Sequence, residues 1–368
     1  MNKSTTRLLF LLMTVCFLHK VKGRCSTTGT NGIAACQCNF MEACDAQGNP
    51  NPNLAKYLPT VVDQLGLAEK GQRDLAYLCE GGDAVGILYD CHNRIPLYAA
   101  TVIYGAQLLG VSEGLKRRPK FKNSRQIFKR FQQQDEDYED ASKRELCYSS
   151  LLGGNNYVVE EEWTNAIGNS FFNAQPCPRG LSVETSISRG HLIASQYGRN
   201  YQTKKKATFK YTNVVPQFAT FNSKSWENYE TKLITWGTQN CAEVKGATNV
   251  RLFIVVGAIP STVRGPSKQR YFGKKGFSDY TDPILYPVNV PSHMWTAACC
   301  TYSDKGKLRY RSTAFWRENN PGNAPCNRAD VRYLTRWLSR WIAGGTVSFN
   351  LFPQTSQCNN IGNYIPLP

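Results

Sequence analysis

Three short groups of residues between positions 184 and 230 have the types and the order that suit work on a phosphate ester. The first group is Ser188 to His191, with the sequence Ser-Arg-Gly-His. The second runs from Thr212 to Gln217, and the third consists of Asn222, Trp226 and Glu230 at fourfold spacing. Each group alone recurs by chance, so the order and the spacing of all three carry the information.

The first group combines a proton acceptor with a phosphate ligand. An imidazole such as that of His191 takes a proton from water near neutral pH. The guanidinium of Arg189 can hold two phosphate oxygens in a bidentate fork. Gly190 between them permits a close backbone approach or a positive φ, which predicts that the cation and the imidazole share one bend. The alternative for a lone histidine is a structural role.

The third group predicts oxygen ligands on a helix. Residues 223–239 carry apolar side chains at helical spacing. Asn222, Trp226 and Glu230 are four apart and drift only slowly around such a helix, so the side-chain oxygens of Asn222 and Glu230 can approach one site. Hard oxygen donors with little charge suit Mg²⁺, which keeps most of its water ligands. The alternative for Asn222 is an N-cap.

Two basic tracts leave open interpretations. Lys204, Lys205 and Lys206 lie between the first two groups, and they predict either contacts with a phosphate backbone or a solvated lysine run. Residues 115–130 are strongly basic and are followed by acidic residues at 135–140. We interpret this second pair as a solvated surface loop.

The elements that must position these residues are mixed strands and helices. Residues 86–103 form two β-rich runs around Asn93 and Arg94, which predicts a hairpin, and residues 251–259 predict a buried strand. Residues 329–342 have a helical apolar stripe. The opposite face of that helix carries three arginines, interpreted as facing solvent: Arg332, Arg336 and Arg340. Without regular βαβ alternation, the order favours an α+β fold.

The N-terminus predicts export. Residues 1–23 begin with Lys3 and Arg7 and continue with an apolar run that is too short to span a bilayer, as in a secretory signal peptide. Removal of its four basic residues lowers the net charge from +17 to +13, and loss of Cys16 lowers the cysteines from 14 to 13. In an oxidising compartment most of these pair, and the odd number leaves one thiol over.

Composition narrows the class further. Hydrophobic residues make up 41% and aromatic residues 12% of the 368 residues, which excludes a disordered chain. No apolar run after the N-terminus reaches the length of a membrane helix, so no membrane association is expected. We assign residues 24–80, which are rich in cysteine, to a disulfide-stapled N-terminal extension.

Together the three groups resemble the DNA/RNA non-specific endonuclease family, the ββα-metal nucleases. That family shows Asp-Arg-Gly-His, then Asn-x-x-Pro-Gln, then an Asn followed by Trp four residues on and Glu eight residues on. The matching residues are Arg189 to His191, Asn213 to Gln217, and the group from Asn222 to Glu230. Residues 289–300 resemble the secreted animal branch, the endonuclease domain-containing 1-like proteins.

The resemblance implies a fold and an assignment of roles. The fold is a central antiparallel sheet flanked by helices, with the site on a strand–strand–helix unit within residues 81–360. His191 would be the general base. Asn222 would be the direct ligand of Mg²⁺, with Mn²⁺ or Ca²⁺ as alternative ions, and Glu230 would hold metal-bound water.

The remaining implied roles concern the substrate. Arg189 and Asn213 would bind phosphate and support the site. One departure stands out, because Ser188 occupies the position of the family's Asp. This Asp is neither the base nor the direct metal ligand, so Ser188 does not disable the implied mechanism.

The sequence thus predicts a secreted, Mg²⁺-dependent endonuclease that cleaves DNA, with RNA as a second substrate class, largely without sequence preference. The alternative, which Ser188 and the basic tracts favour, is an inactive secreted polyanion-binding protein on the same fold. A zinc-using nuclease is a weaker alternative because the chain has only four histidines. The oligomeric state stays open.

Overall fold

A computed structural model describes most of the chain outside the N-terminus and one long internal stretch. The described residues are 32–45, 47–59, 75–91, 93–110, 119–122, 124–127, 187–198, 201–218, 220–261, 271–272, 288–320, 322–343, 349–353 and 355–368. The predicted signal peptide, the acidic residues 135–140 and about half of the basic tract 115–130 lie outside them.

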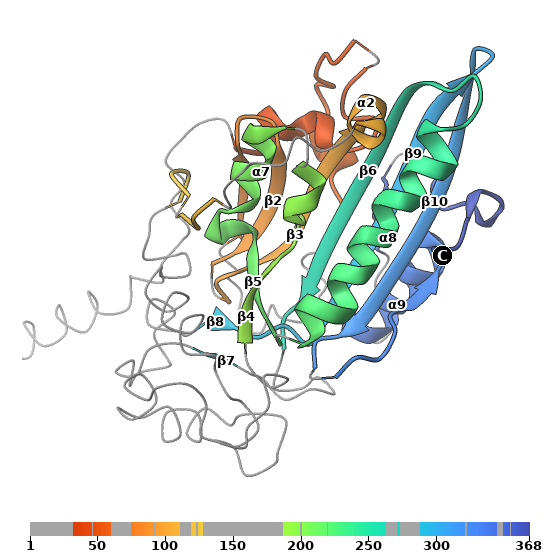
Figure 1. The fold of residues 1–368 in the computed structure, drawn as a ribbon. Coiled ribbons are helices and arrows are strands. Elements are labelled where there is room, and N and C mark those ends of the chain that lie inside the picture. The colour runs from red at the N-terminus through yellow and green to blue at the C-terminus, as the bar shows by residue number, and fades with distance from the viewer. Residues whose placement is uncertain are drawn as a thin grey trace, which may run out of the picture.

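A seven-stranded sheet in which every neighbouring pair is antiparallel forms the centre of the molecule (Figure 1). Its strands, in spatial order, are β1 Leu75–Glu80, β2 Val85–Asp90, β3 Ile95–Tyr104, β6 Thr248–Ile259, β9 His293–Asp304, β10 Lys307–Glu318 and β11 Asn327–Ala329. Two small antiparallel pairs lie outside it: β4 Ile187–His191 with β5 Val214–Phe218, and β7 Tyr271–Phe272 with β8 Val288–Asn289.

The helical elements are short apart from two. They are η1 Gly32–Asn39, η2 Leu54–Tyr57, α2 Gly105–Leu109, η5 Ser195–Gly198, α7 Gln202–Thr208, η6 Tyr211–Asn213, η7 Phe221–Trp226, α8 Glu227–Gly237, η8 Thr238–Ala242, α9 Val331–Ala343 and η9 Ile361–Asn363. Here η7 and η8 are π-helical turns that extend α8 at its two ends. Among the described residues, no helix has the length and apolar character needed to cross a membrane.

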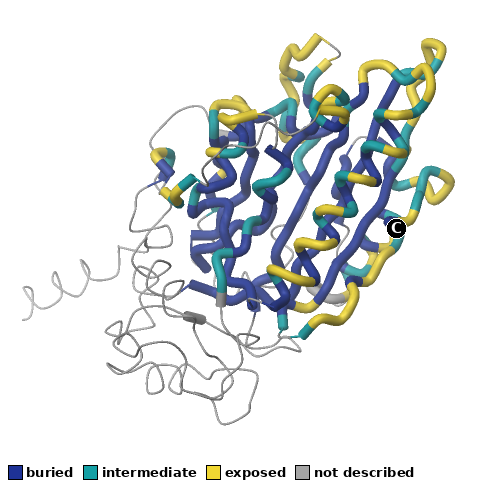
Figure 2. The backbone as a smooth tube through the Cα atoms, in the orientation of Figure 1, coloured by how far each residue is buried: buried dark blue, intermediate teal, exposed yellow. Residues whose placement is uncertain are grey.

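Two hydrophobic cores lie on opposite faces of the sheet. On one face, Trp226 of the turn before α8 and Leu233 and Trp236 of α8 belong to a core shared with β5 and with the residues that follow β4. On the other face, Leu334 and Leu338 of α9 pack with the N-terminal η1. Figure 1 shows α8 in front of the sheet and α9 behind it, and Figure 2 shows the strands almost wholly buried. The predicted α+β class is confirmed.

The strongly patterned elements are confirmed as well. The hairpin predicted around Asn93 and Arg94 is β2–β3, and its turn places Arg94 at φ 55°. The predicted strand 251–259 lies within β6, the helix 329–342 corresponds to α9, and the helix 223–239 falls within η7, α8 and η8.

The cysteine-rich extension is joined to the sheet. A disulfide links Cys36 in η1 to Cys79 in β1, and a second links Cys38 to Cys44. Because β1 is the first strand of the seven-stranded sheet, the sheet begins at Leu75, within the segment that the sequence assigned to the extension.

Two adjacent cysteines fasten both layers to β9. Cys300 pairs with Cys241 in the turn after α8, and Cys299 pairs with Cys358 in the C-terminal segment. Neighbouring residues of a strand point to opposite faces, so one disulfide holds each face. Among the described cysteines, Cys326 is a buried free thiol.

Candidate functional site

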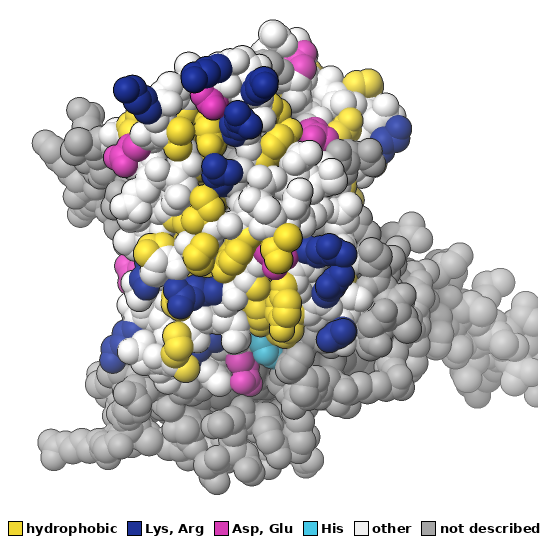
Figure 3. Space-filling model, turned by 90° about the vertical axis from the view of Figure 1, so that its right-hand side faces the viewer, with side chains coloured by type: hydrophobic (Ala, Val, Ile, Leu, Met, Phe, Trp, Pro, Cys, Tyr) yellow, Lys and Arg dark blue, Asp and Glu magenta, His cyan; other side chains and the backbone are white. Residues whose placement is uncertain are grey.

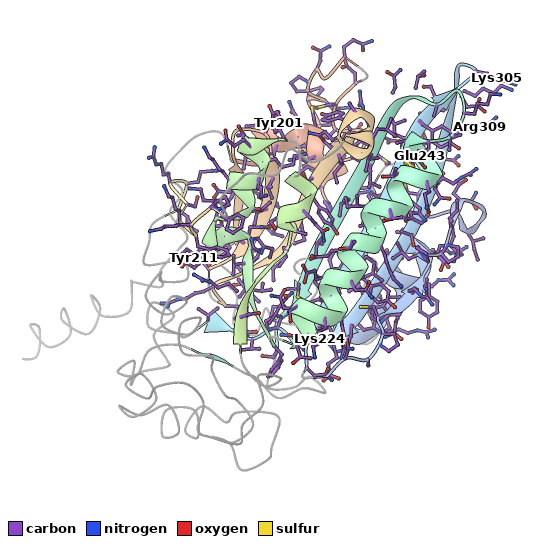
Figure 4. All side chains as sticks on the ribbon, viewed as in Figure 1. Tyr201, Tyr211, Lys224, Glu243, Lys305 and Arg309 are labelled. Atoms are coloured by element: carbon purple, nitrogen blue, oxygen red, sulfur yellow. A yellow bond between two sulfur atoms is a disulfide. The ribbon has the colours of Figure 1, made fainter. Side chains whose placement is uncertain are left out.

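The three residue groups meet in one strand–strand–helix unit. β4 carries the first group, β5 follows the start of the second, and η7 with α8 carries the third. β4 and β5 pair so that Arg189 lies opposite Pro216 and His191 lies opposite Val214. Figure 4 labels Lys224, which follows Asn222 by two residues in η7, at the end of the helix where η7 leads into α8. The same figure labels Tyr211 beside β5.

Gly190 serves close packing within an extended strand. A Cβ built on Gly190 would lie 2.1 Å from the Cδ atom of Gln217 on the paired strand. The φ of Gly190 is not positive. The predicted bend is therefore wrong: Arg189 and His191 are residues i and i+2 of a strand, and they share one face of it.

Arg189 and His191 contact the same aromatic ring. The guanidinium carbon of Arg189 lies 4.5 Å from the ring centroid of Phe121. The ring centroids of His191 and Phe121 are 5.2 Å apart, and Phe209 meets His191 edge-on at 4.8 Å. The candidate base and the candidate phosphate ligand thus lie side by side against the rings of Phe121 and Phe209, which we call the aromatic wall.

Asn222 is tied to β4 through the residue that departs from the family pattern. Its amide nitrogen Nδ2 donates a hydrogen bond to Ser188 Oγ at 2.9 Å, and Ser188 Oγ lies 3.3 Å from the carbonyl of Gln217. Asn222 occupies the second position of η7, after Thr220 as the cap residue, so it is not an N-cap. The bond fixes the amide while its oxygen Oδ1 remains the group suited to a cation.

The helix is anchored between Asn222 and Glu230. Trp226 is fully buried and packs on Phe221 at 5.4 Å and on Phe315 of β10 at 5.1 Å. Burial raises the pKa of Glu230 to about 8, against a hydrogen bond from Gln196 that lowers it. Because Gln196 follows β4 by five residues, the helix contacts this chain segment on both sides of His191.

Comparison of the sequence with known protein families identifies the family of this chain. The sequence model of the family described as "DNA/RNA non-specific endonuclease" matches residues 83–338, more than half of the chain. The chain belongs to the DNA/RNA non-specific endonuclease family. Its domain is therefore that of a non-specific nuclease, which acts on nucleic acid.

Other comparisons add little. No curated protein matches the chain in sequence. Among solved structures, the chain is similar to one in the "Crystal structure of the EndoG/EndoGI complex: Mechanism of EndoG inhibition". The two are 16% identical, the match covers 77% of this chain and 88% of that chain, and the TM-score is 0.44.

The residues present fit a lightly held divalent cation. Asn222 supplies an amide oxygen that its bond to Ser188 orients, and Glu230 supplies a carboxylate on the same helix. Among the described residues, no three His, Cys, Asp or Glu side chains gather to enclose an ion. An amide oxygen and a carboxylate are hard donors, as suits a divalent cation that keeps several of its waters.

Two predicted substrate contacts are corrected by burial. Asn213 is fully buried, its Oδ1 accepts from the Ile193 amide, and its Nδ2 donates to the carbonyls of Ile193 and Thr208, each at 3.0 Å. Both amide hydrogens are used within the protein, so Asn213 supports the chain after β4 and has no amide hydrogen left for a phosphate.

Lys204 is the second correction. It is 4% exposed, and its Nζ donates to the carbonyl of Val102 in β3. Burial lowers the pKa of Lys204 to about 8. Successive residues of α7 point about 100° apart, so the three lysines cannot share one face. Lys205 is half-buried and Lys206 exposed, and these two stay candidates for phosphate contact.

Other basic and aromatic features lie away from the unit. His293 packs on Trp337 of α9 at 5.4 Å, on the sheet face opposite α8. The α9 arginines are exposed on that side. Figure 3 views the neighbouring side of the molecule, where basic side chains form a column beside hydrophobic ones.

The sequence did not reveal the aromatic wall. Phe121 lies in the basic tract, about 70 residues before His191, and no local pattern marks it. Phe209 lies four residues before Asn213, outside the three motif groups, and no local pattern marks it as part of the site either.

Proposed function

We propose that this chain is a secreted, Mg²⁺-dependent endonuclease that hydrolyses phosphodiester bonds of DNA, with RNA as a second substrate class and little sequence preference. The observation that carries the proposal is the β4–β5–α8 unit. It arranges Arg189 and His191 on one strand and ties that strand to the helix of Asn222 and Glu230. On the likeness of residues 289–300, we place the chain in the endonuclease domain-containing 1-like branch.

In this mechanism His191 accepts a proton from the water that attacks phosphorus. Arg189 binds the non-bridging phosphate oxygens, whose charge grows in the transition state. Asn222 and Glu230 would hold the divalent cation and its surrounding water. When bound, that cation supplies positive charge to the phosphate and the leaving oxygen.

The setting supports secretion and backbone binding. Disulfides of the described residues join η1 to β1 and both layers to β9, as suits an oxidising compartment. The net charge of +17, or +13 without residues 1–23, and the exposed Lys206 favour contact with a phosphate backbone, which makes binding weaken with salt and nearly independent of sequence.

The decisive experiment is nicking of supercoiled plasmid by the purified chain with Mg²⁺, Mn²⁺, Ca²⁺ or EDTA. His191→Ala should abolish nicking and leave the unfolding midpoint near that of the wild type. His293→Ala is the matched control, because this histidine lies on the opposite face of the sheet. Undiminished nicking by His191→Ala would rule out the assignment of the base.

Ser188 favours a second candidate, an inactive polyanion-binding protein. Its hydroxyl oxygen accepts a hydrogen bond from the Asn222 amide and carries no charge. A wild-type chain that binds DNA at low salt but cleaves under none of these conditions would support this candidate. Appearance of cleavage in Ser188→Asp would then identify the missing carboxylate as the cause.

A further inference from the structure

We infer that Phe121 is a positioning residue that holds Arg189 and His191 side by side for one phosphate group. The inference rests on the proposed nuclease function, and it concerns a residue outside the three motif groups. Phe121 belongs to the strap, defined as residues 119–127, of which all but 123 are described. This segment is part of the tract that the sequence suggested to be a solvated loop.

Phe121 contacts both functional side chains directly. Its ring lies 4.5 Å from the guanidinium carbon of Arg189, which is cation–π geometry. The same ring lies 5.2 Å from the imidazole of His191 at an interplanar angle of 38°. One rigid ring therefore sets the separation of a flexible cation and an imidazole.

The ring is itself fixed by its neighbours. It packs on Phe209 at 4.9 Å and on Tyr211 at 5.7 Å. The backbone amide of Lys122 donates to the Phe209 carbonyl at 3.0 Å, and the amide of Tyr211 donates to the Lys122 carbonyl at 3.1 Å. These bonds pair the strap with the chain that leads into β5.

A second anchor holds the other end of the strap. The side chain of Gln126 accepts from the Cys79 amide at 2.9 Å and donates to the Cys79 carbonyl. Ile127 is buried in the core on the α8 side of the sheet. Because the strap is attached to β1 and to the chain before β5, Phe121 has little freedom to move away from the site.

The strap also separates apolar from charged side chains. Phe121 is half-buried against the site, while Lys120 and Lys122 on either side of it are exposed. This alternation is that of an extended segment with its aromatic ring turned inward. A solvated loop would leave the Phe121 ring in water, whereas a positioning role requires the ring to pack against the site.

Arg189 has the most to gain from this contact. Its side chain has several rotatable bonds, and a fork must be oriented to bind two phosphate oxygens. Stacking on a fixed ring removes most of that freedom before the substrate arrives. The benefit then falls on the chemical step, where misplacement of a reacting group by about 1 Å costs on the order of a hundredfold in rate.

The test compares Phe121→Leu with Phe121→Tyr in steady-state cleavage of a duplex. Leucine keeps an apolar side chain but removes the ring, so kcat should fall by about 10- to 100-fold with KM changed by less than about threefold. Tyrosine keeps the ring and should retain kcat within about twofold. Tyr57→Leu is the control, a half-buried aromatic residue of η2 that packs on the opposite face.

A second readout does not depend on cleavage. The imidazole signals of His191, assigned in NMR spectra with His191→Ala, sense the Phe121 ring current and should shift in Phe121→Leu but stay in place in Tyr57→Leu. A shift in a chain without nuclease activity would uphold the contact of Phe121 with His191 and refute the nuclease proposal alone. Unmoved His191 signals, or equal losses of kcat in Phe121→Leu and Phe121→Tyr, would overturn the inference.

Discussion

The buried amine of Lys204 makes a quantitative prediction about stability. The pKa of Lys204 is lowered from 10.5 to about 8 because burial disfavours the charged form. Between these two values the unfolded chain binds a proton that the folded chain does not, so this group makes the folded state more stable as the pH rises. Below pH 8 the protonated amine is a cost to the fold.

The size of that cost follows from the shift. The difference between 10.5 and about 8 corresponds to about 3 kcal/mol. Lys204→Met keeps the length of the side chain and removes the charge, but it also removes the hydrogen bond to the Val102 carbonyl, worth about 1 kcal/mol. At pH 7 the variant should therefore be more stable than the wild type by about 2 kcal/mol.

The same reasoning reverses the sign at high pH. Near pH 10.5 the wild-type amine is neutral in the folded state and half protonated in the unfolded state, so little of the burial cost remains. The loss of the hydrogen bond then makes the variant less stable, by somewhat less than about 1 kcal/mol. Denaturant unfolding of both proteins from pH 7 to 10.5 measures this difference, in which the titrations of all other groups cancel.

Lys206→Met is the matched control, because Lys206 is exposed on the same helix. Its stability difference should be near zero throughout, whereas its affinity for DNA should fall and lose about one unit of salt slope. Lys204→Met should leave DNA affinity unchanged. A stability difference for Lys204→Met that does not vary with pH, or a loss of DNA affinity equal to that of Lys206→Met, would refute the assignment of Lys204 to the core.

Further expectations concern a thiol, a carboxylate and a surface. Burial raises the pKa of Cys326 to about 12, so a maleimide at pH 8 should label this cysteine only after denaturation, as peptide mass spectrometry would show. Burial raises the pKa of Glu230 from 4.5 to about 8. Between these pH values the folded, metal-free chain binds a proton that the unfolded chain has lost, so the free energy of unfolding should decrease as the pH rises from 4.5 to about 8. Glu230→Gln should remove that slope in denaturant unfolding, and an unchanged slope would contradict the burial. Replacement of Arg332, Arg336 and Arg340 by glutamine should leave kcat for cleavage within about twofold, because α9 lies on the face opposite the site; a large loss in the cleavage assay would place substrate there.

Elements with a clear period were predictable from the sequence. The apolar run of β6 and the helical stripe of α9 each depend on local residues, and both elements form where the pattern indicated. These two elements need no knowledge of contacts between distant segments. That a strand pair and a helix share one site was implied by the resemblance of the three motif groups to the endonuclease family, and not by their spacing alone.

Long-range packing was the part that the sequence concealed. Phe121 reaches the site only because the strap docks on the chain before β5, and no pattern within the basic tract indicates this. The sequence suggested a phosphate contact for Asn213 because it does not reveal that this side chain is buried. Lys204 left no signal either, because three successive lysines span about 200° of a helix, an arc that can lie wholly in solvent.

Because Cys299 and Cys300 are adjacent in β9, formation of their disulfides depends on the register of this strand in the sheet. Their partners, Cys358 and Cys241, are each separated from them by 59 residues, so loop length alone does not distinguish the native pairs from the exchanged ones. Only the position of β9 in the sheet does, because a slip by one residue would turn each thiol to the wrong side. Correct pairing can therefore be completed only after β9 has paired with its neighbours β6 and β10, and the disulfide map of the folded protein records that this step succeeded.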